Sequence, residues 1–203
     1  MKKLIVVLLL AFAPAAVFAQ AQIMPHIGLN LFQLSGDPDG VTHTTGAGYT
    51  IGANLRLGGL FFLQPGIEYL GESSVRYYKD PNGGVNTNSI SHTTDFNTIR
   101  IPVVAGIQLL GESAPVNVNV HAGLSTRLTV GVEEEGADVS DYYNTFNLAG
   151  VIGAGAELFF LTFDIDFEVG LTDYAKQNKL PVGVSNDSKS FSILFNIGSK
   201  FPL

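Results

Sequence analysis

Apolar and polar residues alternate with a period of two along several segments of the chain. From Val116 to Val130 the even positions carry Val, Ala, Leu and Thr, whereas the odd positions carry Asn, His, Gly, Ser, Arg and Thr. The same alternation runs from Gly46 to Leu57 and from Leu161 to Leu171. Strict alternation is typical of β-strands that have one apolar and one polar face. These three segments are therefore predicted strands.

Five further segments fit a strand pattern less cleanly, and none has helical periodicity. The first of them places Phe32 and Leu34 on its polar side, and the fourth does the same with Val151 and Phe159. With the three clear segments they make eight predicted strands in all. The five segments are His26–Leu34, Phe61–Gly71, Phe96–Leu109, Phe146–Phe159 and Ser190–Phe201.

The connections between these segments alternate between long and short. Residues 35–45, 72–95, 131–145 and 172–189 form long connections, whereas residues 58–60, residues 110–115 and a turn near Phe160 are short. Outer-membrane barrels have long loops outside the cell and short turns in the periplasm. The pattern predicts an all-β fold, an eight-stranded antiparallel up-and-down transmembrane β-barrel with both termini on the periplasmic side.

The polar face decides between a membrane barrel and a soluble, lipocalin-like barrel, because a lipocalin turns its apolar face inward around a ligand. Every predicted strand carries glycine on its polar face, and the other residues there are mostly Asn, Thr and Ser. Small residues suit the crowded interior of an eight-stranded barrel, whereas glycine weakens a strand whose face meets water. We therefore expect the polar face inside and the aliphatic face against lipid. These glycines are Gly28, Gly52, Gly66, Gly106, Gly123, Gly153, Gly155, Gly170 and Gly198.

The charged residues of the strands also fall on the predicted inner face, in two layers. We expect them to pair into a structural network that fills the lumen, because an unpaired buried charge is strongly destabilising. A path for protons or solutes is the alternative. The lower layer is Arg56, Glu157, Asp164 and Lys200, and the upper layer is Glu68, Arg100, Arg127, Asp166 and Glu168.

The N-terminus has the layout of a secretory signal peptide. Lys2 and Lys3 precede an uninterrupted apolar run, and small residues follow up to Ala19. The apolar run is too short to span about 30 Å of hydrocarbon as a helix. We predict a signal peptide over residues 1–19 and a barrel domain over residues 20–203, located in the bacterial outer membrane.

Composition and charge exclude several other classes of protein. The chain has no cysteine, a net charge of −7 and no basic patch, so nucleic-acid binding has no support. No cofactor motif, metal-spaced cluster or phosphate loop is present. His26, His43 and His92 are expected at a strand start or in long loops, and His121 lies about 13 Å from Ser125 along an extended strand. The sequence therefore predicts no catalytic, cofactor or metal residues and a protein that is not an enzyme.

Acidic and aromatic residues gather in the predicted outer loops. We expect the acidic groups to form solvated loops, with a cation site as the alternative because oxygen ligands suit hard cations. The tyrosine pairs Tyr77-Tyr78 and Tyr142-Tyr143 are predicted to lie at the membrane interface. The acidic residues are Asp37, Asp39, Glu133, Glu134, Glu135, Asp138 and Asp141.

Short motifs along nearly the whole mature chain resemble the PorT-like outer-membrane β-barrel domain family. They include His26-Ile27-Gly28-Leu29-Asn30, Leu34-Ser35-Gly36-Asp37, residues 48–52, Leu63-Gln64-Pro65 with Tyr69, Ile99-Arg100-Ile101-Pro102, residues 153–157 and residues 170–172. Gly66 departs from the family, where an acidic residue often follows Gln-Pro, and we expect Glu68 to supply that inward charge. The resemblance implies a membrane barrel without known catalytic residues. The founding relatives are implicated in protein secretion, but no residue here carries that role.

Together these patterns predict a non-enzymatic outer-membrane barrel with a plugged lumen and a structural or partner-interaction role through its outer loops, associated with envelope or secretion machinery. Its expected partners are outer-membrane lipid, a protein at the outer loops and the barrel-assembly machinery, which would recognise the aromatic-containing last strand that ends at Phe201 and Leu203. The alternatives are a soluble periplasmic lipocalin-like barrel, a lipid-acting outer-membrane enzyme and a small channel.

Overall fold

A computed structural model of the protein describes residues 21–35, 41–78, 91–110, 116–174 and 189–203. The predicted signal peptide, residues 1–19, lies outside these described residues. So do Asp37 and Asp39, which the sequence placed in an acidic outer loop. Within the described residues no helix is long and apolar enough to cross a membrane.

The wall of the molecule is a closed antiparallel barrel in which strands adjacent in sequence are hydrogen-bonded neighbours. The first strand closes the barrel by pairing with both β9 and β10, which continue one another on either side of Lys200. Eight wall strands result, as predicted. They are β1 (Ala21–Ser35), β2 (Val41–Gly58), β3 (Phe61–Tyr78), β4 (Ser91–Gln108), β5 (Val116–Glu134), β7 (Phe146–Leu158), β8 (Leu161–Gly170) and β9 (Lys189–Ser199) with β10 (Phe201–Pro202).

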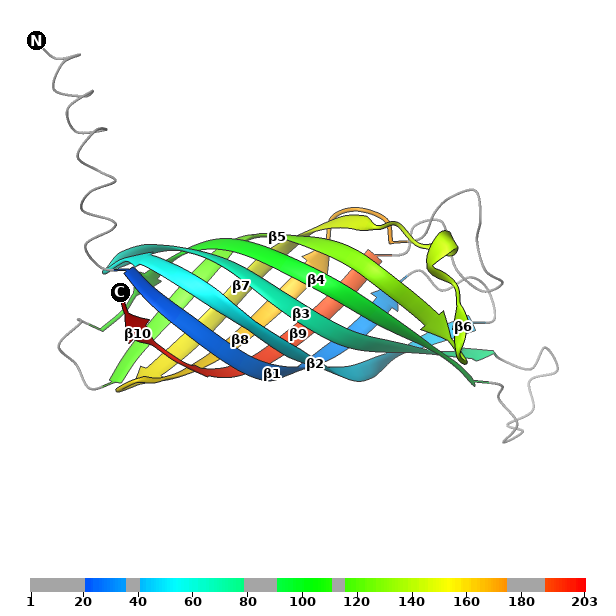
Figure 1. The fold of residues 1–203 in the computed structure, drawn as a ribbon, viewed down its shortest axis with the longest axis horizontal. Helices are drawn as coiled ribbons and strands as arrows, with labels where there is room; N and C mark the ends of the chain where they lie inside the picture. The colour runs from blue at the N-terminus through cyan, green and yellow to red at the C-terminus, as the bar shows by residue number, and fades with distance from the viewer. Residues whose placement is uncertain (1–20, 36–40, 79–90, 111–115, 175–188) are drawn as a thin grey trace, which may run out of the picture.

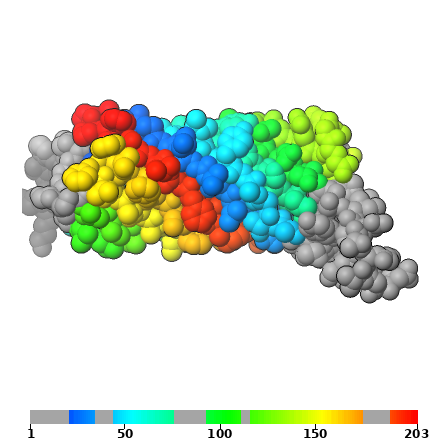
Figure 2. Space-filling view, turned by 90° about the horizontal axis from the view of Figure 1, so that it is seen from below, coloured from blue at the N-terminus to red at the C-terminus, as the bar shows by residue number. Residues whose placement is uncertain are grey.

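The short turns after β2 and β7 lie at one end of the barrel, and the strand ends that flank the longer connections lie at the other (Figure 1). The turns after β2 and β7 lie at the same end as the C-terminus, which we call the periplasmic end. At the outer end the two-residue strand β6 (Ala137–Asp138) pairs with β5, and a short 3-10 helix, η1 (Ser140–Tyr142), follows it. The strands cross the surface obliquely, with β9, β1 and β2 side by side (Figure 2).

The aliphatic side chains face outward and the polar side chains face inward, as expected for a membrane barrel. Ile27 and Ile152 are 59% and 64% exposed, whereas Arg100 and Arg127 are fully buried. The inward glycines provide room for these side chains, because a Cβ atom on Gly153 would meet the ring of His121 and the carboxylate of Asp166. The lipocalin-like alternative, with an apolar interior, is therefore wrong.

The strands on one side of the barrel extend further outward than the sequence predicted. Ser73 and Ser74 of β3 pair with Asp95 and Thr94 of β4, so the connection spans residues 79–90 rather than 72–95. Polar residues on both faces of this extension remove the alternation that marks a strand. His43 and His92, which fall in the predicted long connections 35–45 and 72–95, instead lie at the outer ends of β2 and β4.

Candidate functional site in the barrel lumen

An arginine at the centre of the lumen contacts carboxylates from two walls of the barrel. The guanidinium of Arg100 donates to Glu68 at 2.7 Å and to Glu168 at 2.6 Å. A longer ion pair of 3.4 Å joins it to Asp166. Glu68 is the register partner of Arg100 on β3, whereas Asp166 and Glu168 reach across the lumen from β8. Four of the five residues in the predicted upper layer therefore meet at Arg100.

Arg127 of β5 extends this layer towards the outer end. It donates to Glu168 at 2.9 Å and to the hydroxyl of Ser192 at 3.0 Å, and it forms an ion pair with Glu72. Glu72 is not among the predicted interior charges, because the predicted third strand ends at Gly71. Glu72 follows Glu68 and Leu70 on the inner face of β3, because all three lie two residues apart. A predicted strand one residue longer would therefore have included it.

A second ion cluster fills the periplasmic end of the lumen. Arg56 forms an ion pair with Glu157 and donates to the amide oxygen of Gln64 at 2.8 Å. Its guanidinium also lies over the ring of Phe62, 4.3 Å from the ring centre. Lys200 donates to the other oxygen of Glu157, and its side chain remains 25% exposed. Three of the four predicted lower-layer residues therefore contact one another.

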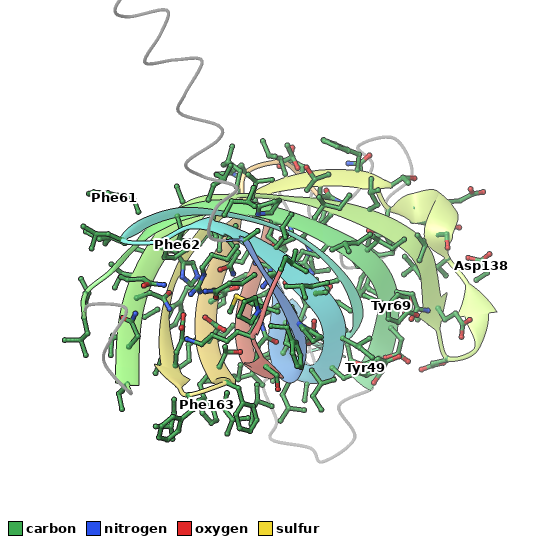
Figure 3. All side chains as sticks on the ribbon, turned by 60° about the vertical axis from the view of Figure 1, so that its left-hand side comes forward. Tyr49, Phe61, Phe62, Tyr69, Asp138 and Phe163 are labelled. Atoms are coloured by element: carbon green, nitrogen blue, oxygen red, sulfur yellow. The ribbon has the colours of Figure 1, made fainter. Side chains whose placement is uncertain are left out.

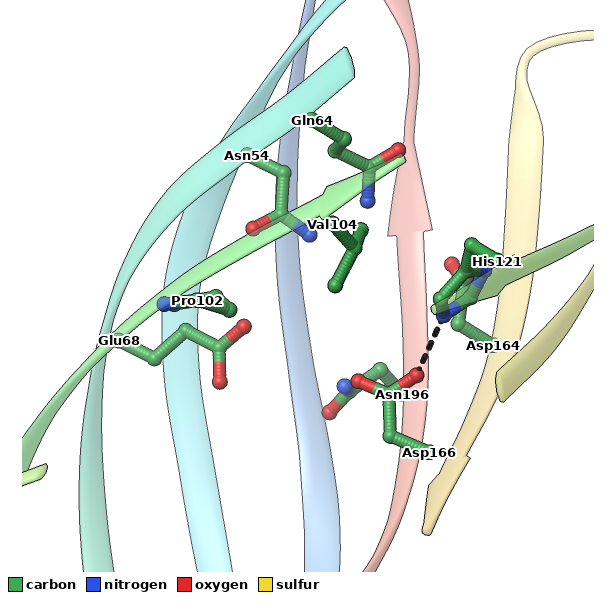
Figure 4. A pocket seen from close by; sticks show the side chains of 9 residues that line it. All are labelled: Asn54, Gln64, Glu68, Pro102, Val104, His121, Asp164, Asp166 and Asn196. Atoms are coloured by element: carbon green, nitrogen blue, oxygen red, sulfur yellow. Dashed lines mark hydrogen bonds and ion pairs between the residues drawn. The ribbon is translucent and has the colours of Figure 1, made fainter. Parts of the chain in front are cut away.

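Asp164, the fourth lower-layer residue, instead lines a polar cavity between the two ion clusters (Figure 4). Two histidines lie at this level. His121 is 2.7 Å from Asp166, and His26 is 3.4 Å from Glu68. The cavity is lined by Asn54, Gln64, Glu68, Pro102, Val104, His121, Asp164, Asp166 and Asn196.

No hydrogen bond joins His121 to Ser125 in the described part of the lumen. His121 and Ser125 both face inward from β5, and the ring of His121 contacts Asp166 and Asn119. Among the described residues, no group of three His, Asp or Glu side chains is arranged to hold a metal ion.

A cluster of apolar and aromatic residues closes the outer end of the lumen. We call it the aromatic cap. The ring of Phe96 packs edge-on against Tyr143 and Tyr174, with centres 5.1 and 5.5 Å apart, and lies 5.4 Å from the ring of Phe32. The guanidinium of Arg127 lies 5.5 Å from the centre of the Phe32 ring, so the cap rests on the ion layer. The cap consists of Phe32, Leu34, Phe96, Val132, Tyr143 and Tyr174.

The cap explains why Phe32 and Leu34 occupy the polar side of their strand, because both belong to this inward cluster. It also corrects one prediction, since Tyr143 is buried in the cap and does not lie at the membrane interface. The side chains of Tyr77 and Tyr78 lie outside the described residues. Tyr49 and Tyr69 face outward instead (Figure 3), with ring centres 6.3 Å apart. The hydroxyl of Tyr69 donates to Asn97 at 2.8 Å.

An eight-stranded barrel with an aliphatic exterior, a polar lumen and short turns at one end defines the class of outer-membrane β-barrel proteins. The family model described as "Outer membrane protein beta-barrel domain" matches residues 18–176. The protein therefore belongs to the outer membrane protein β-barrel domain family. That match does not distinguish the PorT-like group within it.

Solved structures of outer-membrane barrels resemble the chain at low sequence identity. Neisserial surface protein A is 14% identical, with a TM-score of 0.52, and the match covers 88% of this chain and 97% of that one. The attachment invasion locus protein Ail of Yersinia pestis is 12% identical, with a TM-score of 0.47, and the match covers 90% of this chain and 99% of that one. No curated protein sequence matches the chain. The likeness to Neisserial surface protein A supports the fold alone.

Proposed function

We propose that this protein is a non-enzymatic, non-conducting outer-membrane barrel that acts as a rigid structural platform for its outer loops. The proposal rests on buried side chains that cross the lumen at three levels, with the small polar cavity between the two ion clusters. Arg56 occupies the periplasmic end, Arg100 and Arg127 the centre, and Phe96 with its aromatic neighbours the outer end. A solute on a straight path would have to break each of these layers in turn.

The ion layers favour a structural role over a transport path. Each of the three arginines is fully buried and contacts at least one carboxylate. Separating such a pair leaves an uncompensated charge in a poorly solvated space, which is strongly unfavourable. The six carboxylates and four basic side chains of the lumen therefore act as a fixed plug.

Recordings in planar lipid bilayers test the plug directly. We expect the protein to give no regular single-channel steps. The matched variant replaces both Arg100 and Glu168 by serine, which removes one buried pair together and opens space at the centre. We expect this variant to conduct more than the parent. Regular conductance steps from the parent protein would overturn the proposal.

A lipid-acting enzyme is the alternative from another functional class. Such an enzyme needs its nucleophile, its base and an orienting carboxylate within reach of one another at an accessible surface. His121 and Ser125 instead face the lumen, behind the lipid-facing wall. We expect the His121→Ala variant to leave a lipid-modification assay on outer membranes unchanged. Loss of a modification that the parent carries out would favour the enzyme.

We propose that the outer loops contact a protein partner in the envelope or secretion machinery. The hairpin of β5 and β6 supports this, because Glu133, Glu135 and Asp138 are exposed beyond the barrel and acidic. A photo-cross-linker at position 138 in intact cells should capture a discrete protein, whereas one at the lipid-facing position 152 should not. Equal capture at both positions would contradict a loop-specific partner. The motifs quoted above support assignment to the PorT-like group, within which a secretion-related partner would be expected.

Recognition by the barrel-assembly machinery is proposed for the terminal strand. Phe201 lies on the outward face, and it pairs with Ile23 where β1 closes the barrel. We expect Phe201→Ala to reduce the assembled fraction in cells, measured by heat-modifiable migration on a gel. The matched control is Ile197→Ala on the same face. Equal losses for both variants would contradict a specific role of the terminal aromatic residue.

A further inference from the structure

Each of the three connections at the periplasmic end has two consecutive large apolar residues among or beside the residues that the structure describes there. We call these six residues the periplasmic rim. Turn tips usually carry Gly, Pro, Asn, Asp or Ser, because these residues suit tight backbone conformations and water. The most exposed of the six, Phe61 and Phe159, are 72% and 69% exposed. The rim consists of Leu60, Phe61, Leu109, Leu110, Phe159 and Phe160.

The turn between β7 and β8 has a phenylalanine at a position where the backbone is strained. Leu158 pairs with Leu161, and Phe159, the first residue between them, has a φ of 55°. Glycine is favoured at this position of such a turn, and a bulky residue there is an outlier. The chain does use glycine in the β2–β3 turn, where Gly58 has a φ of 110°. A strained residue points to a role for its side chain beyond the turn itself.

The height of the outward apolar band on β3 indicates where the rim lies relative to the membrane. On β3 the outward apolar residues run from Phe61 to Tyr69, where the polar contact with Asn97 begins. At about 3.4 Å per residue and a strand tilt of roughly 40°, this stretch is only about 20 Å tall. The apolar band of an outer-membrane barrel is about 25 Å tall. Because this height of about 20 Å already includes Phe61, the band on β3 would be about 5 Å shorter still if Phe61 and its turn lay in water.

We propose that the periplasmic rim is immersed in the inner leaflet and contacts the acyl chains of phospholipids. At Phe61 the rim adjoins the outward apolar surface of the wall, because Phe61 faces outward while Phe62 turns into the lumen (Figure 3). The six residues belong to or flank the β2–β3, β4–β5 and β7–β8 connections, so they are distributed around the barrel. A distribution of this kind suits a planar membrane, whereas a protein partner would cover one patch. None of the six residues carries a charge.

This placement means that the rim presents no surface to periplasmic proteins. The barrel is held at two heights, by the rim in the inner leaflet and by Tyr49 and Tyr69 at the outer boundary of the lipid. The inference is independent of what the outer loops bind. It depends only on whether the rim lies in lipid or in water.

Tryptophan fluorescence can locate the rim, because the chain contains no native tryptophan. The probes are Phe61→Trp and Phe159→Trp, refolded into phosphatidylcholine vesicles that carry bromine on the acyl chains. The lipid-facing control is Ile27→Trp in the barrel wall, and the aqueous control is Asp138→Trp in the outer hairpin. We expect bromine near the glycerol end of the acyl chains to quench both rim probes, and acrylamide on both sides of the membrane to quench only Asp138→Trp. Rim probes that acrylamide quenches like Asp138→Trp, and that bromolipid leaves bright, would overturn the proposal.

A second test depends on bilayer thickness and does not require a new side chain at the rim. The Phe159→Gly variant removes the aromatic ring and relieves the strained turn in every lipid. The substitution should lower the folding equilibrium constant about tenfold more in fourteen-carbon phosphatidylcholine, where the rim is immersed, than in ten-carbon phosphatidylcholine. The outward Phe163→Ala variant on β8 should lower it to a similar extent in both lipids. An equal effect of Phe159→Gly in both lipids would contradict immersion.

Discussion

The centre of the lumen and its outer end are filled in different ways. At the centre, Arg100 and Arg127 contact carboxylates that all belong to wall strands. At the outer end, Tyr143 and Tyr174 of the aromatic cap come from segments between strands and pack against Phe96. The central layer depends on charge pairing, and the cap depends on the packing of rings. The two regions should therefore respond differently to substitution.

The largest expected effect comes from loss of the central cation. Arg100→Met leaves the carboxylates of Glu68, Glu168 and Asp166 without their shared partner in a buried site. Breaking a buried ion pair by removing one partner destabilises proteins by about 3–5 kcal/mol. We expect the free energy of unfolding to fall by that amount, measured by urea titration of the barrel in lipid vesicles.

The double variant Arg100→Met with Glu68→Gln is the matched control for this measurement. It removes one of the stranded charges, so it should recover part of the lost stability. A loss of less than about 1 kcal/mol in the single variant would show that water or a bound ion replaces the arginine. The central layer would then not be a fixed plug.

Substitutions in the aromatic cap should lower the free energy of unfolding through lost packing. Phe96→Ala removes a ring that contacts Phe32, Tyr143 and Tyr174. Truncation of a buried phenylalanine costs about 3 kcal/mol, because a cavity is left behind. The same titration should show this loss, whereas Val103→Ala on the lipid-facing side of β4 should cost less, since lipid fills the space. Equal losses for the two variants would mean that the cap does not pack as a core.

The inward direction of the central charges is predictable from the sequence, and the residues of the cap largely are not. A period of two assigns Glu68, Arg100 and Arg127 to the same face as the glycines, so their location inside the barrel follows from local pattern. Contacts across the lumen, such as that from Arg100 to Glu168, depend on the tilt and closure of the barrel, which no single strand encodes. Glu72 lay one residue beyond the recognised end of its strand.

Phe32 and Leu34 look like errors in a strand pattern until the partners that cover them are known. Those partners include Tyr143 and Tyr174, which lie in segments with no periodicity. The position of Phe159 was predicted wrongly for another reason. Alternation places this residue on the inner face of its strand, whereas it lies in an exposed turn. Local alternation therefore describes the wall of the barrel better than it describes either end.

A smaller loss of stability is expected at the periplasmic end, where Arg56 and Lys200 both contact Glu157. The Arg56 side chain is fully buried, whereas that of Lys200 is a quarter exposed. Exposed ion pairs contribute about 0–1 kcal/mol and are screened by salt. We expect Lys200→Met to cost no more than about 1 kcal/mol, and the cost to shrink in high salt. Arg56→Met should cost more and depend little on salt. The same salt dependence for both variants would contradict the difference in burial.

The smallest expected effect concerns the segment that leads into the cap. The backbone N–H of Ser140 donates to the carboxylate of Asp138 at 2.9 Å, where η1 begins and the chain turns towards Tyr143. Hydrogen bonds from Ser140 hold the pKa of Asp138 below its usual value of 3.8. Because the folded pKa is lowered, this support is present above pH 3.8 and is lost as the pH falls through the lowered value. The Ser140 amide resonance should therefore titrate below pH 3.8.

Substitution at position 138 separates this hydrogen bond from the packing of the cap. Asp138→Ala removes the acceptor, so hydrogen exchange should become faster at the amide of Tyr143, which donates to the carbonyl of Ser140 within the same turn. Asp138→Asn keeps an acceptor and should preserve most of the protection while abolishing the titration. If Tyr143 exchanges at the same rate in all three proteins, its position depends on contacts with Phe96 and Tyr174 alone. Faster exchange only in Asp138→Ala would mean that the hydrogen bond to Asp138 helps to hold Tyr143 in position.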